Sequence, residues 1–171
     1  TRCYDSGPCG EPHYLCQAMT IHSEDTGEHS GVSLSCTGDG RYTCMDVTLE
    51  SAATLPCSLD CVSTGKEVCK GLAFDCAGAN ALTCKGESAC SSAEYHCGDD
   101  CALTCEDGCQ SLKFHAGSGA TIDCKATMWK QSAVHVGQQV CKSLVHTGPG
   151  FATLNCEGTN ACQSLSATGL P

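Results

Sequence analysis

The stretches "CQSLKFHAGSGATIDC" (residues 109–124) and "CKSLVHTGPGFATLNC" (residues 141–156) are two versions of one phrase. Both begin Cys-x-Ser-Leu, pass through a Gly-rich middle and end in a cysteine fifteen positions after the first. The same step separates the cysteines at 69 and 84 and at 90 and 105, and looser copies occupy 16–36 and 44–57. Periods of roughly 20–50 residues are the signature of stacked-repeat folds. The repeat therefore decides the fold class.

Each copy contains two short strand patterns. In the first half, apolar residues stand three and five positions after the opening cysteine, as Leu112 and Phe114 do, and this alternation predicts a strand with one buried face. In the second half, Leu or Ile stands two positions before the closing cysteine, which predicts a second strand. Glycine and polar residues between the halves predict a corner. The predicted core residues include Leu72, Phe74, Leu82, Leu112, Phe114 and Ile122.

A unit of this size cannot bury its apolar face alone, so its copies must stack, with strands of neighbouring coils about 4.8 Å apart. The sequence predicts an all-β protein, a disulfide-stapled parallel β-solenoid of about six coils of about 21 residues. A β-sandwich, the main alternative, does not repeat one phrase at equal intervals. The handedness of the coil does not follow from the pattern.

The solenoid is predicted to occupy residues 16–171, after a Cys-bearing N-terminal lead segment at 1–15. Its coils are predicted to start near residues 16, 44, 69, 90, 109 and 141, with a half coil from 162. The connector at 125–140 is longer than the others and is predicted to be an insertion.

The cysteine content sets the compartment. The chain has 19 cysteines among 171 residues, a density typical of disulfide frameworks in an oxidising environment. Zinc sites usually use paired CxxC knuckles, and the sequence has none. It has no apolar run near the ~20 residues of a membrane span. We therefore expect a secreted or cell-surface protein without membrane insertion, from which a signal peptide has already been removed.

The connectors between coils vary in length but keep a cysteine at each end, which predicts a disulfide across each connector. The predicted connector pairs are Cys9–Cys16, Cys36–Cys44, Cys57–Cys69, Cys84–Cys90, Cys105–Cys109, Cys124–Cys141 and Cys156–Cys162. Cys76 and Cys97 both lie seven residues after an opening cysteine, so we expect them to stack and bond. A bond between Cys57 and Cys61 is the alternative to the bond between Cys57 and Cys69. The partners of Cys61 and Cys101 stay open, and Cys3 is a candidate for an intermolecular bond.

Charge and motifs exclude several function classes. A net charge of −10 argues against nucleic acid and anionic membranes as partners. The chain lacks the common nucleophile-elbow, zinc-protease and phosphate-loop motifs. We therefore expect no enzymatic activity, no catalytic residues and no cofactor.

Two surface features remain as candidate sites. Asp75, His96 and His115 each stand six residues after an opening cysteine and would form a column in stacked coils. Such a column suits a divalent transition metal, although a solvated polar row is the simpler interpretation. The second feature is a ladder of small polar residues on the outer face of the second strands, a possible ligand or glycan face. Its members are Ser33, Ser35, Thr54, Thr83, Thr104, Thr121 and Thr153.

The Ser/Thr ladder resembles the regular rows of ice-binding β-solenoids, but Pro, Asp and Asn interrupt it. It could equally carry O-linked glycans or pack against another chain. The phrases "CKGESACSS" (84–92) and "CEGTNACQS" (156–164) resemble Cys-rich repeats of secreted surface proteins of protists and algae, over about residues 44–168. This resemblance implies an extracellular stacked-repeat protein.

The ends of a solenoid expose unpaired strand edges. The sequence ends half a coil into "CQSLSATGLP" (162–171), and no capping helix is evident at either end. We therefore expect head-to-tail self-association, which propagates as a filament unless it closes into a ring. The predicted function is a structural protomer of an extracellular filament, coat or matrix. The alternative is a binding module for ice, glycan or metal.

Overall fold

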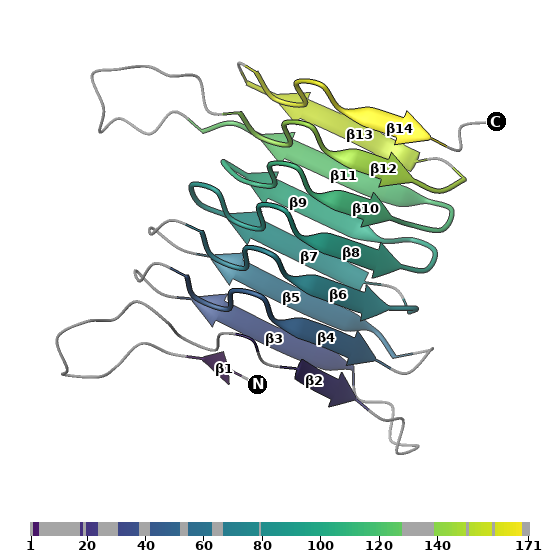
Figure 1. Ribbon diagram of the computed structural model, residues 1–171. Coiled ribbons are helices and arrows are strands. Elements are labelled where there is room, and N and C mark those ends of the chain that lie inside the picture. Colours follow the sequence, from purple (N-terminus) through teal and green to yellow (C-terminus); the bar gives the residue numbers. More distant parts are fainter. Residues whose placement is uncertain are drawn as a thin grey trace, which may run out of the picture.

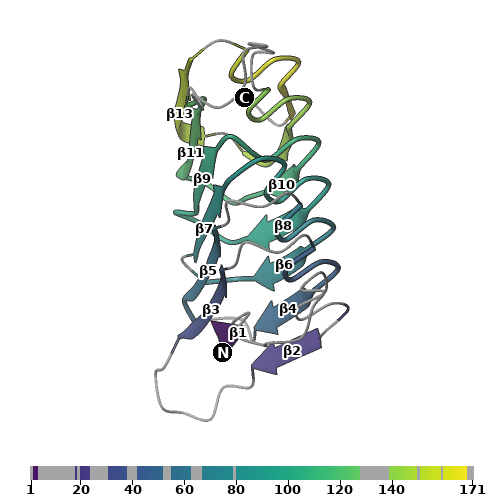
Figure 2. The same ribbon diagram turned by 90° about the vertical axis from the view of Figure 1, so that its left-hand side faces the viewer.

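The computed structural model of the chain is a parallel β-solenoid, as the repeat predicts. The structure describes residues 2–3, 18, 20–23, 31–37, 42–51, 55–62, 67–78, 80–127, 139–149, 151–158 and 160–168. Two seven-stranded parallel sheets face each other along the length of the molecule (Figures 1 and 2). Among the described residues, no helix is long and apolar enough to span a membrane.

Successive strands alternate between the two sheets. The first sheet contains β1 (Arg2–Cys3), β3 (Val32–Thr37), β5 (Cys57–Val62), β7 (Asn80–Lys85), β9 (Ala102–Glu106), β11 (Ala120–Lys125) and β13 (Phe151–Glu157), in that order. The second contains β2 (Thr20–Ser23), β4 (Thr48–Ser51), β6 (Ala73–Cys76), β8 (Glu94–Cys97), β10 (Lys113–His115), β12 (Val145–Thr147) and β14 (Ser166–Thr168). The lead segment predicted to lie outside the coils thus contributes β1, which pairs with β3.

Side chains form columns because neighbouring strands are paired in register. On the second sheet, Phe74, Tyr95 and Phe114 are aligned and fully buried, with successive ring centroids 4.9 and 5.1 Å apart. On the first sheet, the buried column consists of Leu34, Leu59, Leu82, Leu103 and Ile122. The six core residues predicted from the repeat are all at most 1% exposed. The apolar pattern therefore places the core correctly.

An arc around each opening cysteine closes the coil, and alternate residues in it have left-handed backbone conformations. In one coil Ser88, Cys90 and Ser92 have φ angles of 61°, 52° and 56°. The Cys90 amide donates to Val68 O of the preceding coil at 2.8 Å, and the Ser92 amide donates to Gln110 O of the following coil at 2.9 Å. Left-handed backbone costs a non-glycine residue roughly 1–2 kcal/mol, which these hydrogen bonds between coils offset.

The arcs explain the recurring Cys-x-Ser phrase. In the coils that open at residues 44, 69, 90, 109, 141 and 162, the residue two positions after the opening cysteine has a left-handed backbone. None of these six residues is β-branched. These residues are Asp46, Gly71, Ser92, Ser111, Ser143 and Ser164. Valine, isoleucine or threonine would crowd the backbone there, because a branched Cβ fits poorly at positive φ.

Eight disulfides join cysteines of the described residues. Five are connector pairs as predicted: Cys36–Cys44, Cys84–Cys90, Cys105–Cys109, Cys124–Cys141 and Cys156–Cys162. Their Cα atoms lie 5.9–6.1 Å apart. In each, the cysteine that closes the second strand bonds to the one that opens the next coil. The bond therefore ties the first sheet to the arc.

The predicted pair Cys57–Cys69 is wrong, and so is the coil boundary at Cys57. Cys61 bonds to Cys69, because Leu59 and Cys61 are in register with Leu82 and Cys84. The sequence contains Leu-x-Cys at both 55–57 and 59–61, and only the second fits the register. Position 54, predicted for the Ser/Thr ladder, lies outside the described residues and before β5, whose outward residues are Ser58 and Asp60.

The predicted bond between Cys76 and Cys97 is also wrong, although the two are in-register neighbours. Such neighbours point the same way from strands about 4.8 Å apart, whereas a disulfide needs Cβ atoms about 3.8 Å apart. Cys76 bonds instead to Cys57, and Cys97 bonds to Cys101 across the corner of its own coil. At the corner between Cys57 and Cys76, buried Asn80 accepts from the Cys57 amide at 2.9 Å and donates to the Cys76 carbonyl.

Cys9 and Cys16 lie outside the described residues, so their predicted bond stays a prediction. The backbone of Cys3 is in register with Cys36, in the column of strand-closing cysteines. Every other member of that column described here bonds to the opening cysteine of the next coil. The predicted intermolecular bond of Cys3 also stays a prediction.

Corners between the two strands of a coil are tightly stacked. A Cβ atom on Gly98 would lie 2.2 Å from Ala77 O, and one on Gly148 would lie 2.0 Å from Ala116 O. Glycine is therefore needed where the corner backbones of successive coils approach each other.

We expect non-reducing peptide mapping of thiol-blocked protein to recover Cys57–Cys76, Cys61–Cys69 and Cys97–Cys101 as linked peptides. A Cys57–Cys69 or Cys76–Cys97 peptide would contradict the register. The same map decides whether Cys16 is linked to Cys9, as predicted from the sequence, and whether Cys3 is linked to another chain.

Substitution of exposed Ser111 tests the left-handed arc. We expect Ser111→Val to lower the free energy of unfolding by about 1–2 kcal/mol relative to Ser111→Gly, because only glycine adopts this φ without strain. Urea unfolding with the disulfides intact measures the difference. Thr104→Val, at an exposed strand position, is the control and should change stability by less than about 0.5 kcal/mol. Equal stability of the two Ser111 variants would contradict the arc geometry.

Candidate functional site

The outer face of the second sheet brings together a carboxylate and two imidazoles. Alternation along β8 places Glu94 and His96 on the outer face, with Tyr95 between them in the core. In β10, His115 is in register with His96. His96 Nε2 donates to Glu94 Oε1 at 3.0 Å, and His115 Nε2 lies 3.5 Å from the same oxygen. The three side chains come from adjacent coils and meet only because the strands are in register.

Neighbouring groups orient this cluster. The two imidazole rings are stacked, with centroids 4.2 Å apart and planes inclined by 20°. His115 Nδ1 is hydrogen-bonded to the Thr147 hydroxyl on β12, which directs Nε2 toward Glu94. Lys113 Nζ lies 3.5 Å from the other Glu94 oxygen, Oε2. The cluster is half-buried, with 32–45% of each of its three side chains exposed.

The pKa values in the cluster favour an ionised carboxylate beside a neutral imidazole. The hydrogen bond from His96, followed by the charge of Lys113, lowers the pKa of Glu94 below its usual value. Burial, followed by the proximity of His96, lowers the pKa of His115. Neutral imidazole and ionised carboxylate are the forms that bind metal ions.

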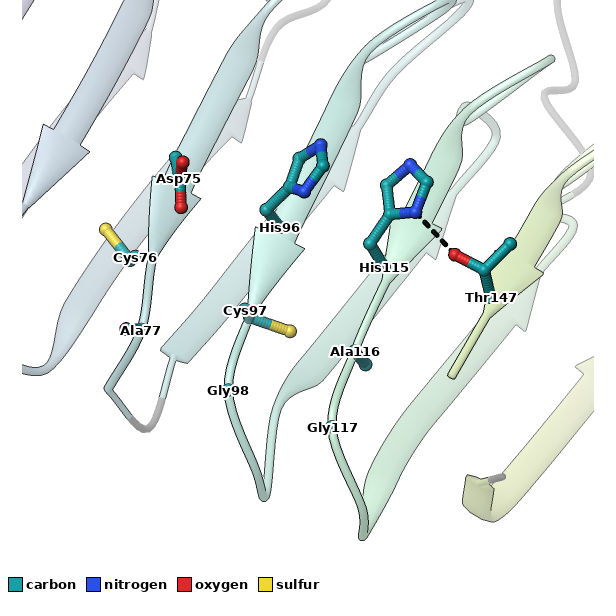
Figure 3. Close-up of a pocket in the computed structure, with 10 residues that line it drawn as sticks. All are labelled: Asp75, Cys76, Ala77, His96, Cys97, Gly98, His115, Ala116, Gly117 and Thr147. Carbon is teal, nitrogen blue, oxygen red and sulfur yellow. Dashed lines mark hydrogen bonds between the residues drawn. The ribbon is translucent and has the colours of Figure 1, made fainter. Parts of the chain in front are cut away.

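The predicted Asp75–His96–His115 column exists, but its members do not form one cluster. Asp75 is in register with His96 and lines the same shallow hollow, of about 330 Å³, together with His115 and Thr147 (Figure 3). The ligand atoms that lie within 4.8 Å of one another belong to Glu94, His96 and His115. Glu94 was missed in the sequence, although its place two residues before His96 puts it on the same strand face.

His146 lies on the inner face of the solenoid. His146 follows its opening cysteine by five residues, whereas His96 and His115 follow theirs by six. The register therefore places His146 beside Phe114 in the aromatic column. Its ring is 1% exposed and lies 5.5 Å from the Phe114 ring centroid to centroid. Burial, followed by the proximity of His115, lowers the pKa of His146.

The Ser/Thr ladder lies on the outer face of the first sheet as two in-register columns. One column contains Ser33, Ser58, Ala81, Ala102, Thr121 and Thr153, and the other contains Ser35, Asp60, Thr83, Thr104, Asp123 and Asn155. Two alanines interrupt the first column. Two aspartates and an asparagine interrupt the second, where Asn155 Nδ2 donates to Asp123 Oδ1 at 2.5 Å. The face has small side chains but no continuous hydroxyl row.

A third column on this face alternates in charge. Lys85 Nζ lies 2.7 Å from Glu106 Oε2, and Lys125 Nζ lies 3.5 Å from Glu157 Oε2. The paired lysines neutralise these glutamates, so the column offers no oxygen cage of the kind that calcium requires.

The coil that contains β13 and β14 differs from the others in its exposure. β13 and β14 are the last strands of their sheets, so each has one strand neighbour among the described residues. Leu154 continues the buried Leu column, yet it is 37% exposed, whereas Ile122 on the preceding strand is fully buried. The coil surface at β13 therefore presents an apolar side chain that is partly exposed.

Comparison of the chain with protein-family models, curated proteins and solved structures finds no match. Residues 128–138 of the predicted insertion lie outside the described part of the chain.

We expect acid to destabilise the protein through His146. Its pKa is lowered in the folded state, so the folded state resists protonation while the unfolded state, with a pKa near 6.5, accepts it. This contribution is present above about pH 6.5 and is lost at up to about 1.4 kcal/mol per unit as pH falls. His146→Phe should reduce the loss of stability measured by urea unfolding between about pH 7.5 and 5. Thr104→Val, at an exposed position without a titratable side chain, should leave that loss unchanged. An unchanged pH dependence in His146→Phe would contradict the burial of this ring.

Proposed function

We propose that the protein is an extracellular structural protein whose copies associate end to end into a filament, coat or matrix. The observation that carries the proposal is the open coil surface at β13 and β14. Its central apolar residue, Leu154, is 37% exposed, whereas Leu34, Leu59, Leu82, Leu103 and Ile122 in the same column are at most 1% exposed.

The surface that best fits this open coil is another coil of the same kind. At the opposite end of the second sheet, β2 is the edge strand, and its register defines the same columns. Stacking β14 of one copy on β2 of the next would place Ala167 beside Ile21, both of them half-buried members of the inner column. The contact uses two different surfaces, so it is heterologous and propagates unless rotation closes it into a ring.

The disulfides support a mechanical and extracellular role. Eight bonds tie the coils of the described residues, and bonds of this density are typical of oxidising compartments. The net charge of −10 opposes non-specific contact between copies.

Binding of ice or glycans through the Ser/Thr ladder is the weaker alternative. That face is flat and presents small side chains, but Asp60, Asp123 and Asn155 interrupt its second column. O-linked glycans on its exposed hydroxyls would be compatible with end-to-end assembly, because they would not block the coil ends.

Sedimentation velocity of the disulfide-intact, 171-residue chain tests the assembly. We expect the sedimentation coefficient to rise with protein concentration. Leu154→Lys should abolish the rise, because a charge would be buried at the contact without a partner. Thr104→Lys, which adds the same charge to an exposed position in the middle of the rod, should not.

A monomer at all concentrations, or equal behaviour of the two lysine variants, would contradict end-to-end assembly. So would a native polypeptide whose intact mass shows further coils that cover Leu154. Circular dichroism and non-reducing electrophoresis of each variant verify that the fold and the bridges are retained.

A further inference from the structure

We propose that Glu94, His96 and His115 form a binding site for a divalent transition-metal ion, with Zn²⁺ and Cu²⁺ as the ions that fit it best. This site is independent of end-to-end assembly. It lies on the outer face of β8 and β10, in the middle of the rod, whereas the assembly surface lies at β13 and β14.

The distances between the donor atoms fit a single ion. Four ligands at 2.0–2.1 Å in a tetrahedron are separated from one another by about 3.3–3.4 Å. His96 Nε2 and His115 Nε2 lie 3.0 and 3.5 Å from Glu94 Oε1, and one ligand atom from each of the three residues lies within 4.8 Å of the other two. Because the two rings are stacked, an ion bound by both would require the rings to rotate out of the stack, and the proton of His96 would move from Nε2 to Nδ1. The partial exposure of Glu94 and His96 leaves room for water as a further ligand, whereas Nε2 of His115 is buried and has no hydrogen-bond partner.

The donor set selects the metal class. Imidazole nitrogens suit zinc, copper, nickel and iron, whereas magnesium and calcium prefer sites made entirely of oxygen. Two imidazoles and one carboxylate provide three protein ligands, the number found in open zinc sites. Because divalent copper generally binds such donors more tightly than zinc, Cu²⁺ is the more sensitive probe.

The surrounding residues hold the ligands in the orientation that binding needs. Metal-bound histidines usually have their second ring nitrogen hydrogen-bonded, which selects the tautomer. Thr147 bonds to Nδ1 of His115 (Figure 3). Nε2 of the same ring lies on the side of Glu94. Lys113 contacts Glu94 through Oε2, so Oε1 remains available to an ion. Thr147 is therefore a positioning residue for the site.

A second His–Glu pair on the same sheet shows what the proposed site adds. His22 Nδ1 lies 2.9 Å from Glu50 Oε2, but both side chains are more than half exposed. No third donor from the described residues completes a group of three there. The pair is an ordinary surface contact and provides a matched control within the same chain.

Isothermal titration calorimetry with ZnCl₂ and with CuCl₂ tests the proposal on the disulfide-intact chain, after removal of bound metal by EDTA. Thiols not engaged in disulfides are first alkylated, because the odd number of cysteines would otherwise leave a competing ligand. We expect one saturable equivalent of each ion. Glu94→Gln and His115→Ala should each weaken binding by about 10-fold or more, and Thr147→Val should weaken it by about 10-fold.

The controls distinguish binding at this site from binding at other histidines and at the predicted Asp75–His96–His115 column. His22→Gln should leave the affinity unchanged, and so should Asp75→Asn, because Asp75 lies outside the cluster. Electron paramagnetic resonance of the Cu²⁺ complex should show coupling to two imidazole nitrogens, and to one in His115→Ala. Thermal unfolding of each metal-free variant verifies that the fold is kept.

Absence of saturable binding, or equal effects of His115→Ala and His22→Gln, would overturn the proposal. If Asp75→Asn lost as much affinity as His115→Ala, the metal would belong to the column of Asp75, His96 and His115 predicted from the sequence and not to this cluster.

Discussion

Backbone hydrogen bonds between successive coils, made in strict register, are the constraint on which the rest of this structure depends. In a β-strand, side chains alternate between the two faces, so a slip of one residue would exchange core and surface along a whole strand. In this solenoid such a slip would move Tyr95 to the surface and bring Glu94 and His96 into the core. The aromatic column, the Leu column and the Glu94–His96–His115 cluster all follow from the same register.

The arcs extend this pairing around the third side of each coil, where no strand runs. Left-handed residues alternate with ordinary ones, and the amides of successive left-handed residues, such as Cys90 and Ser92, point toward opposite neighbouring coils. The conformation is costly for non-glycine residues, and the disulfides next to it limit the alternatives open to the unfolded chain. Aromatic residues are only 5% of the chain, so cross-links contribute much of what a larger aromatic core would supply elsewhere.

On some surfaces of the rod the side chains pair with one another, and on others they leave room for a partner or an ion. Lys–Glu pairs lie in one outer column of the first sheet, and the other two outer columns contain small, mostly polar side chains. The open coil at β13 and β14 and the metal-ligand cluster on β8 and β10 are the places where a partner or an ion would add to what the chain itself provides. We propose that the first serves assembly through strand edges and apolar contact and that the second binds an ion on the side of the rod.

The sequence by itself determined the fold class, the core columns and five of the eight described disulfides. Each of these follows from spacing along the chain: apolar residues at period two, a constant Cys-to-Cys step, and a cysteine at both ends of every connector.

Tertiary structure decided what spacing leaves ambiguous. Cys57 and Cys61 both follow a Leu-x-Cys pattern, and only the pairing of Leu59 with Leu82 shows which one closes the coil. Cys76 and Cys97 stack as their positions predict, but parallel side chains on neighbouring strands point the same way and cannot easily bond, so each finds its partner across a corner. The histidine column was visible in the sequence, whereas the convergence of Glu94 on it depends on side-chain direction and distance across two coils, which a one-dimensional pattern does not contain.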